Sequence, residues 1–169
     1  MMVISCSSVS MYKMRIGFSE DIHELVENRP LILGGVIIPS DNGEKAHSDG
    51  DVLLHAISES ILGALALGDL GTFFPDDKDE TLNMDSKFIL AKVKDLMKKE
   101  GYEIGNVDAS IILEKPKLKE YIPLMRKNIA EILDTDIKNI SIKAGTNEKM
   151  DSIGEGKAIK ATSIVLLKK

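Results

Sequence analysis

The sequence predicts an α/β fold, more closely an α+β sandwich, in which helices cover mainly one face of a mixed β-sheet. Two observations predict it. Segments with apolar residues at helical spacing alternate with short runs rich in β-branched residues along a chain of 169 residues. Hydrophobic residues make up 43 % of the chain, which is enough for one packed core. The predicted order is strand, hairpin, helix, helix, strand, helix, strand, strand, without internal repeats.

Helical spacing is clearest in the first predicted helix, which runs from Asp49 to Leu67 and ends at Gly68. Either Ser48 or Asp49 caps this helix, and Asp51 falls in its first turn, where the helix dipole favours a negative charge. A loop follows over residues 68–77.

The other elements follow from the same signals. A hairpin is indicated because two β-rich runs flank the two-residue turn Gly34-Gly35. Pro123 is tolerated in the first turn of the third helix. The strands are predicted over 12–18, 106–113, 140–144 and 158–167, the hairpin over 31–38, and the two remaining helices over 85–99 and 119–133.

Composition excludes several classes of protein. The net charge of −5 argues against non-specific binding to nucleic acids, for which a basic face is expected. The single cysteine, Cys6, excludes an intramolecular disulfide and a Cys-x-x-Cys metal knuckle. The sequence shows neither a transmembrane run nor the basic start of a secretory signal. We expect a protein of the cytoplasm, or of a plastid-like organelle, without nucleic-acid or membrane partners.

The first thirteen residues differ in character from the rest of the chain, because they match none of the patterned segments that follow. We expect residues 1–13 to form a disordered N-terminal extension, with Met14 as the natural beginning. Residues 14–169 should then form a single domain.

Asp21, His23 and His55, here called the triad, are the first candidates for chemistry. In an extended segment, side chains two positions apart leave the same face, so Asp21 and His23 would lie together. His55 falls early in the first predicted helix and could join them. Two imidazoles and one carboxylate leave one position open on a tetrahedral zinc, which is typical of catalytic sites. The alternative is that these are ordinary hydrogen-bonded residues without a metal.

Loops beside the predicted elements supply further polar groups. His47 lies just before the helix, where it either closes the helix entrance or contacts an anion. Thr146 and Glu148 follow the strand 140–144. Either they belong to a solvated loop, or Thr146 contacts phosphate and Glu148 holds a hard cation such as Mg²⁺. Asp69, between two glycines, either sits in a turn or accepts hydrogen bonds from sugar hydroxyls.

Two more segments have two interpretations each. Residues 115–119 form either the solvated start of a helix or a loop that embraces a nucleobase after the preceding strand. Gly154-Glu155-Gly156 either forms a β-bulge or allows another part of the backbone to approach closely.

Seven motifs occur in a characteristic order along the chain. They are Asp21-x-His23, Gly34-Gly35-Val36-x-Ile38-Pro39, Ala46-His47-Ser48-Asp49-Gly50-Asp51-Val52-x-x-His55-Ala56, Leu67-Gly68-Asp69-Leu70-Gly71, Phe74-Pro75-Asp76, Gly105-Asn106-Val107-Asp108 and Glu148-Lys149. In this order they resemble the 2-C-methyl-D-erythritol 2,4-cyclodiphosphate synthase family. The resemblance covers about residues 14–167, and the third motif combined with the fourth and fifth is highly specific.

The resemblance implies an intramolecular phosphoryl transfer by a phosphorus–oxygen lyase of the non-mevalonate isoprenoid pathway. In 4-diphosphocytidyl-2-C-methyl-D-erythritol 2-phosphate, the 2-phosphate attacks the β-phosphorus and CMP leaves, which gives the cyclic diphosphate. Such a reaction requires mainly positioning and charge neutralisation. The resemblance also implies a homotrimer whose active sites lie between neighbouring subunits.

The resemblance further implies roles for individual residues. The triad would bind Zn²⁺, and Glu148 would help to hold a second divalent cation, Mg²⁺ or Mn²⁺. His47 and Thr146 would be catalytic, because they would stabilise the transition state. The residues implied to bind the substrate are Asp21, His23, His47, Ser48, Asp69, Leu70, Gly71, Phe74, Pro75, Asp76, Asp77, Lys78, Leu113, Pro116, Lys117, Leu118, Lys119, Gly145, Thr146, Asn147 and Glu148.

Two segments depart from the family pattern. After Glu148-Lys149 the family has a glycine-rich segment with an aromatic residue and an arginine, whereas residues 150–154 are shorter and have neither. Residues 18–20 replace a glycine–aromatic run before the triad. The first departure removes a set of phosphate contacts, and Lys149 and Lys157 are the nearest cations.

Two other functions are alternatives at this point. One is a metal-stapled trimer that binds a cytidine nucleotide or an isoprenoid without catalysis. The other is a zinc phosphohydrolase, in which water is the nucleophile. Product analysis separates these functions, because hydrolysis gives no cyclic diphosphate.

Overall fold

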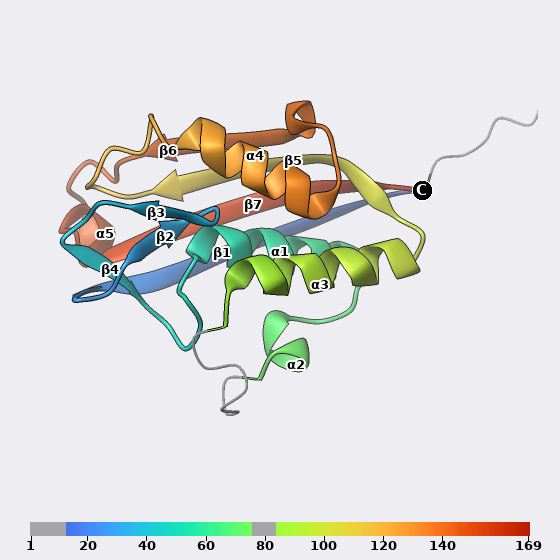
Figure 1. Cartoon of the computed structure of the whole chain (residues 1–169), viewed down its shortest axis with the longest axis horizontal. Helices are drawn as coiled ribbons and strands as arrows, with labels where there is room; N and C mark the ends of the chain where they lie inside the picture. The colour runs from blue at the N-terminus through green and yellow to red at the C-terminus, as the bar shows by residue number, and fades with distance from the viewer. Residues whose placement is uncertain (1–12, 76–83) are drawn as a thin grey trace, which may run out of the picture.

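A five-stranded mixed sheet forms one layer of the molecule, and the longer helices cover one of its faces (Figure 1). The structure is a computed structural model that describes residues 13–75 and 84–169. The expected extension, residues 1–13, therefore lies outside the described residues except for Lys13. The strands of the sheet, in their spatial order, are β4 (Asn42–Lys45), β1 (Met14–Glu27), β7 (Ala158–Lys168), β5 (Glu103–Ile112) and β6 (Ile140–Gly145).

The pairing within this sheet is mixed, as predicted. Strands β5 and β6 run parallel, and the other neighbouring strands are antiparallel. The predicted hairpin forms a separate two-stranded sheet from β2 (Leu31–Leu33) and β3 (Val36–Ile38). Its turn residues, Gly34 and Gly35, have φ angles of 58° and 70°, which glycine adopts without strain.

Three helices lie on the same side of the sheet and share one core with it (Figure 1). They are α1 (Val52–Leu65), α3 (Ser86–Lys99) and α4 (Ile122–Leu133). Shorter elements are α2 (Leu70–Phe73), the 3₁₀ helix η2 (Ile137–Asn139) and α5 (Asp151–Gly154). The predicted fold class is therefore confirmed. Among the described residues, no helix has the length and apolar character needed to cross a membrane.

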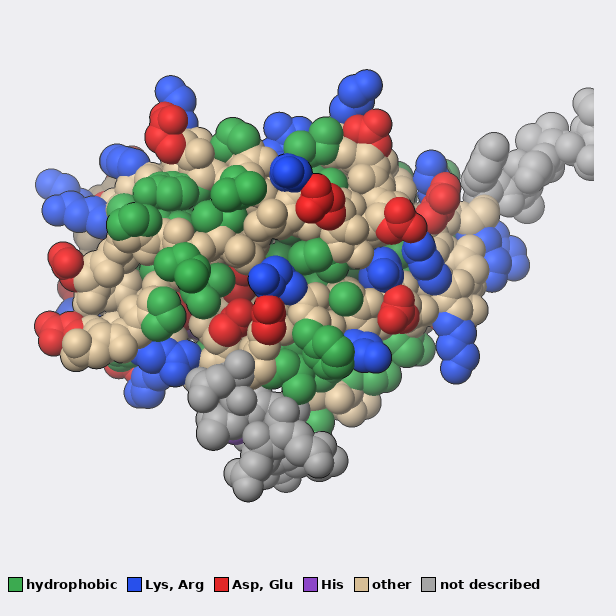
Figure 2. Space-filling view, viewed as in Figure 1, with side chains coloured by type: hydrophobic (Ala, Val, Ile, Leu, Met, Phe, Trp, Pro, Cys, Tyr) green, Lys and Arg blue, Asp and Glu red, His purple; other side chains and the backbone are tan. Residues whose placement is uncertain are grey.

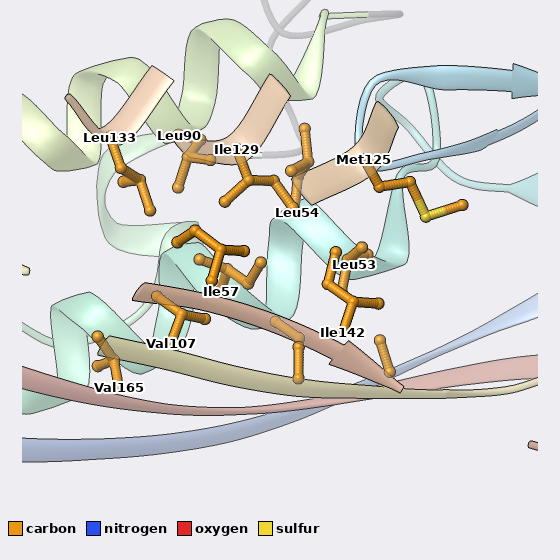
Figure 3. Close-up of a cluster of buried hydrophobic side chains, with 14 of the residues drawn as sticks. Leu53, Leu54, Ile57, Leu90, Val107, Met125, Ile129, Leu133, Ile142 and Val165 are labelled. Carbon is orange, nitrogen blue, oxygen red and sulfur yellow. The ribbon is translucent and has the colours of Figure 1, made fainter. Parts of the chain in front are cut away.

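The core fills the space between the helices and the sheet (Figure 3). Leu54 and Ile57 of α1 lie at its centre and are fully buried. The other side chains labelled in Figure 3 come from α1, α3, α4 and three strands: Leu53, Leu90, Met125, Ile129, Leu133, Val107, Ile142 and Val165. On the helix-covered side, hydrophobic side chains alternate with charges of both signs (Figure 2).

The opposite face of the sheet carries no helix in the described part of the chain, and it exposes large apolar side chains beside the ion pairs Glu20–Lys160 and Asp108–Lys143. Ile16, Phe18 and Ile22 of β1 expose 72 %, 61 % and 54 % of their surfaces, and Ile164 of β7 exposes 48 %. Residues between them in β1 face the helices instead, because side chains alternate along a strand. Gly17 is one of these, and a Cβ there would lie 1.8 Å from the carbonyl oxygen of Ser60 in α1. The close approach of α1 to β1 therefore requires glycine at this position.

Helix α1 starts later than predicted. Its N-cap is Asp51, whose carboxylate accepts a hydrogen bond from the backbone N–H of Leu54 at 3.0 Å. The same carboxylate accepts bonds from both backbone N–H groups of the hairpin turn, at 3.0 and 2.7 Å. The prediction that Ser48 or Asp49 caps the helix is therefore wrong, because one buried carboxylate serves both the helix and the hairpin.

The end of α1 and the loop after it also differ from the prediction. The helix ends at Leu65 and not at Leu67, because Ala66 already adopts a left-handed conformation with φ of 58°. The predicted loop 68–77 contains the short helix α2. Asp69 caps α2, since its Oδ1 accepts bonds from the backbone N–H and the hydroxyl of Thr72.

Other boundaries shift for local reasons. Strand β1 continues to Glu27, beyond its predicted end at Phe18, because its second half pairs with β7 as far as Glu24 and with β4 from Glu24 to Glu27. Strand β4 was not predicted, and α4 begins three residues later than expected. Gly154 lies in α5, so a bulge there is wrong. The close-approach alternative holds instead, since a Cβ at Gly154 would lie 2.2 Å from the carbonyl carbon of Lys149.

Candidate metal centre

Strand β1 and the start of α1 bring the triad together. Asp21 and His23 are two residues apart in β1 and share its helix-facing side, while His55 is the fourth residue of α1. Asp21 Oδ2 lies 3.1 Å from Nε2 of His23 and 3.3 Å from Nδ1 of His55. One ligand atom from each residue lies within 4.8 Å of the others. The three side chains can therefore hold a divalent metal ion, which fits the metal-binding alternative and the ligand set that the resemblance implies.

The outer nitrogen of each imidazole has its own partners. Nδ1 of His23 lies 2.8 Å from Oε2 of Glu44 and 3.0 Å from the carbonyl oxygen of Gly50. Nε2 of His55 lies 3.1 Å from the hydroxyl of Ser48, and the hydroxyl of Ser86 is a further partner at 3.0 Å. These contacts orient both rings so that the remaining nitrogen of each points toward Asp21.

The triad is electrostatically coupled. Burial tends to raise the pKa of Asp21, but hydrogen bonds with both imidazole rings outweigh burial and hold this pKa well below its ordinary value. Burial alone would lower the pKa of His23, yet the carboxylates of Asp21 and Glu44 raise it. Desolvation raises the pKa of Glu44 despite its contact with His23. A metal-ligating histidine must be neutral, so metal and proton compete for His23.

The triad opens into a pocket of about 390 Å³, here called the metal pocket. Several residues implied to bind substrate line it, namely Asp21, His23, His47, Ser48, Leu70, Gly71 and Phe74. Sequence reasoning missed four further lining residues, Lys45, Ala46, Met84 and Ile89. Two other residues implied to bind substrate flank this pocket in sequence without lining it. Asp69 is the N-cap of α2, and Pro75 directly follows the lining residue Phe74. Asp76, Asp77 and Lys78, also expected to bind substrate, lie outside the described residues.

A second group of predicted residues lines a different pocket, of about 450 Å³, here called the β5–β6 pocket. These residues are Leu113, Pro116, Lys117, Leu118, Lys119, Gly145 and Thr146. The pocket lies at the carboxyl ends of the parallel strands β5 and β6, where backbone groups are released from the sheet. Residues 115–119 precede α4 and form a loop, so the helix-start interpretation is wrong.

Asn147 and Glu148 come directly after Thr146, the last residue in sequence that lines the β5–β6 pocket. Thr146 donates a hydrogen bond from its hydroxyl to Oε1 of Glu148 at 3.1 Å. The backbone N–H of Asn147 donates to Oε1 of Glu114 at 2.9 Å. Glu148 has a positive φ of 49°, which is uncommon outside glycine. The loop is therefore anchored just beyond the end of β5 through the Glu114 carboxylate.

The strand register shows how the two pockets are separated. Asp21 on β1 pairs with Ala161 on β7. On the other side of β7, Ala161 pairs with Ile111 on β5, and Ile111 in turn pairs with Ala144 on β6. Three strand spacings of about 4.8 Å therefore separate the triad from the strand that leads to Thr146, or about 14 Å across the sheet. One chain thus brings the triad together with His47 and Ser48. It does not bring Thr146 or Glu148 to the same pocket.

Sequence reasoning also missed the groups behind the triad. Glu44 lies in an unpredicted strand, within a polar run that looks like a surface turn. Ser86 looks like an ordinary residue at a helix start, although Asp49 accepts hydrogen bonds from its backbone and its hydroxyl. No local signal marks either residue, because both reach the histidines through contacts distant in sequence.

Comparison with known proteins identifies a family that matches nearly the whole chain. The YgbB family model matches residues 14–168. The chain belongs to the YgbB family. A curated relative from Brachyspira hyodysenteriae, named 2-C-methyl-D-erythritol 2,4-cyclodiphosphate synthase, is 54 % identical over 92 % of this chain and 99 % of its own length. A relative of the same name from Finegoldia magna is 53 % identical over 92 % and 98 %.

Solved structures of YgbB relatives agree in fold. A structure described as the CDP complex of IspF from Plasmodium falciparum has a TM-score of 0.80 at 40 % identity, covering 91 % of this chain and 95 % of that one. The bifunctional IspDF from Campylobacter jejuni has a TM-score of 0.89 at 41 % identity. This comparison covers 93 % of the present chain but 42 % of the bifunctional protein. The resemblance inferred from the motifs is confirmed.

Proposed function

We propose that this chain converts 4-diphosphocytidyl-2-C-methyl-D-erythritol 2-phosphate to 2-C-methyl-D-erythritol 2,4-cyclodiphosphate and CMP. The observation that carries the proposal is the 54 % identity to a synthase of this name across 99 % of that synthase, in a chain whose triad is assembled. The activity is that of a phosphorus–oxygen lyase in the non-mevalonate isoprenoid pathway.

The reaction needs no protein nucleophile, since an oxygen of the 2-phosphate is already anionic. This oxygen forms a bond to the β-phosphorus, and the bond from that phosphorus to the oxygen bridging it to the α-phosphate breaks, so that CMP leaves with the electron pair. The chain must hold the two phosphates in line and neutralise their charge. His47, in the metal pocket, and Thr146, in the β5–β6 pocket, are the residues we assign to stabilising the transition state.

Zinc is the metal we assign to the triad. Nitrogen and oxygen donors about 2.0–2.1 Å from a tetrahedral zinc lie about 3.3 Å from one another. The separations of 3.1 and 3.3 Å from Asp21 Oδ2 to the two imidazole nitrogens suit this geometry. Zinc held there would polarise the attacked phosphoryl group. Glu148, an oxygen donor, would help to hold Mg²⁺ or Mn²⁺.

A homotrimer is the assembly we assign to the chain. The apolar sheet face, with Phe18 at 61 % exposure, is surface that burial between subunits would stabilise. In a closed ring with head-to-tail contacts, unlike edges of neighbouring subunits meet. The triad lies next to one edge of the sheet and the β5–β6 pocket at the other edge. The two pockets of neighbouring subunits can then share one substrate, with the cytidine half in the β5–β6 pocket.

Phosphorus NMR of the product tests the proposed function. Incubation of the zinc-loaded chain with the diphosphocytidyl substrate should give the cyclic diphosphate and CMP in equal amounts. A linear phosphate product would instead identify a phosphohydrolase, and tight CMP binding without turnover would identify a non-catalytic binding protein. A Thr146→Val variant, which removes the hydroxyl at nearly constant volume, should lower kcat while zinc stays bound.

A further inference from the structure

Glu44 is a buried carboxylate directly behind the triad. It lies on the four-residue strand β4 and is fully buried. Its Oε2 contacts Nδ1 of His23 at 2.8 Å and accepts a hydrogen bond from the backbone N–H of Val52 at 3.2 Å. Its Oε1 has no hydrogen-bond partner among residues 13–75 and 84–169. A carboxylate that is buried and only half satisfied costs stability, so its presence calls for a functional explanation.

The contacts of Glu44 determine which nitrogen of His23 faces the other triad residues. Two acceptors, the Glu44 carboxylate and the Gly50 carbonyl at 3.0 Å, face Nδ1. Nδ1 therefore carries a hydrogen, and Nε2, 3.1 Å from Oδ2 of Asp21, is the nitrogen that would give up its proton to a metal ion. His55 differs, because its outer nitrogen meets two neutral hydroxyls that can either donate or accept.

Glu44 also connects the two elements that carry the histidines. His23 belongs to β1, and Val52 is the first residue of α1, one turn before His55. The same carboxylate oxygen contacts both, so it fixes β1 and α1 relative to each other at this point. Gly50 allows this packing, because a Cβ there would lie 2.9 Å from Cβ of Glu44.

We propose that Glu44 is a positioning residue that orients His23 for metal binding and thereby raises the affinity of the triad for zinc. Carboxylates that accept a hydrogen bond from a metal-ligating histidine strengthen that ligand, and their loss typically lowers metal affinity 10–100-fold. The inference rests on the proposed zinc site. The burial of Glu44 and its contact with His23 are observed without a metal, so the two can be tested separately.

The test is a zinc titration of the full chain against a chromophoric chelator, with Glu44→Gln and Glu44→Leu variants. Glutamine can keep both hydrogen bonds of Oε2 but is a weaker acceptor than a carboxylate, and leucine removes both bonds. We expect the Kd for zinc to rise about 10-fold in Glu44→Gln and about 100-fold in Glu44→Leu. Urea midpoints measured with EDTA should show that the metal-free Glu44→Gln variant is as stable as the wild type.

Glu24→Gln is the matched control, since it removes a carboxylate from β1 one residue after His23. Glu24 is exposed and pairs with Lys45 at 2.8 Å, so this variant should bind zinc like the wild type. The inference is overturned if Glu44→Gln and Glu44→Leu both bind zinc within 2-fold of wild type, or if Glu24→Gln weakens zinc as much. If instead the wild-type chain binds zinc no better than a His23→Ala variant, the zinc site itself is wrong.

Discussion

Replacing Phe18 by alanine should weaken the proposed trimer without affecting the fold of the subunit. Phe18 lies on the apolar face of the sheet and exposes 61 % of its surface in the single chain. Full burial of a phenylalanine side chain contributes about 1.5–3 kcal/mol, so burial of the exposed part contributes about 1–2 kcal/mol per subunit. Because the subunit core does not include this face, the variant should keep its secondary structure.

The trimer contains this residue three times, so the loss per trimer is about 3–6 kcal/mol. At about 1.4 kcal/mol for each factor of ten, the association constant of the trimer should fall by roughly 10²–10⁴. Sedimentation velocity over a dilution series measures this change. The activity of Phe18→Ala should also depend on protein concentration and recover when the enzyme is concentrated, since each site would need two subunits.

Phe88→Ala is the matched control for this experiment. Phe88 lies on α3, exposes 48 % of its surface, and its ring contacts Lys92 on the helix-covered side of the molecule. Its loss should leave assembly unchanged. The reasoning is refuted if Phe18→Ala dissociates at the same concentration as wild type, if Phe88→Ala weakens assembly equally, or if the wild-type chain is a monomer at micromolar concentration.

Three further predictions follow from the site and its supports. His55→Ala should lose most of its zinc in metal analysis while circular dichroism stays near wild type; full zinc content would remove His55 from the ligand set. Gly17→Ala should lower the free energy of unfolding by at least about 1–3 kcal/mol in urea titrations, because its Cβ would meet the Ser60 carbonyl at 1.8 Å; an unchanged midpoint would contradict that contact. Lys149→Ala or Lys157→Ala should raise KM for the substrate with nearly unchanged CMP affinity, as expected if a lysine replaces the missing arginine; unchanged kinetics in both variants would rule this out.

The pairing of Asp21 with His23 was predictable because it depends on local geometry. The two-residue spacing of Asp21 and His23 places both side chains on one face of any extended strand, whatever that strand pairs with. His55 reaches them only through the packing of α1 on β1, so its place in the triad was expected from the family resemblance and not from spacing. The predicted strand nevertheless stopped at Phe18, because the polar residues that form the site interrupt the apolar pattern by which strands are recognised.

The cap of α1 could not be chosen from the sequence. Ser48, Asp49 and Asp51 are all good N-cap residues, and the helix pattern allows each of them. The hairpin decides between them, because its two turn N–H groups need an acceptor and Asp51 supplies it from 16 and 17 residues away. Glu44 was missed for the same reason. Its role depends on the meeting of β1, β4 and α1, which no local spacing reports.

The strand order makes assembly part of the proposed chemistry. An intramolecular attack requires the reacting phosphorus and oxygen atoms to be held about 3–3.5 Å apart. Within one chain, the triad and the strand that leads to Thr146 are three strand spacings apart, about 14 Å across the sheet. The diphosphate would have to stretch across this distance to reach both pockets of one subunit. In the proposed ring the opposite sheet edges of neighbouring subunits meet, so the metal pocket of one and the β5–β6 pocket of the next can enclose the same diphosphate. The apolar face of the sheet, although it lines neither pocket, would thereby determine whether the phosphates can react.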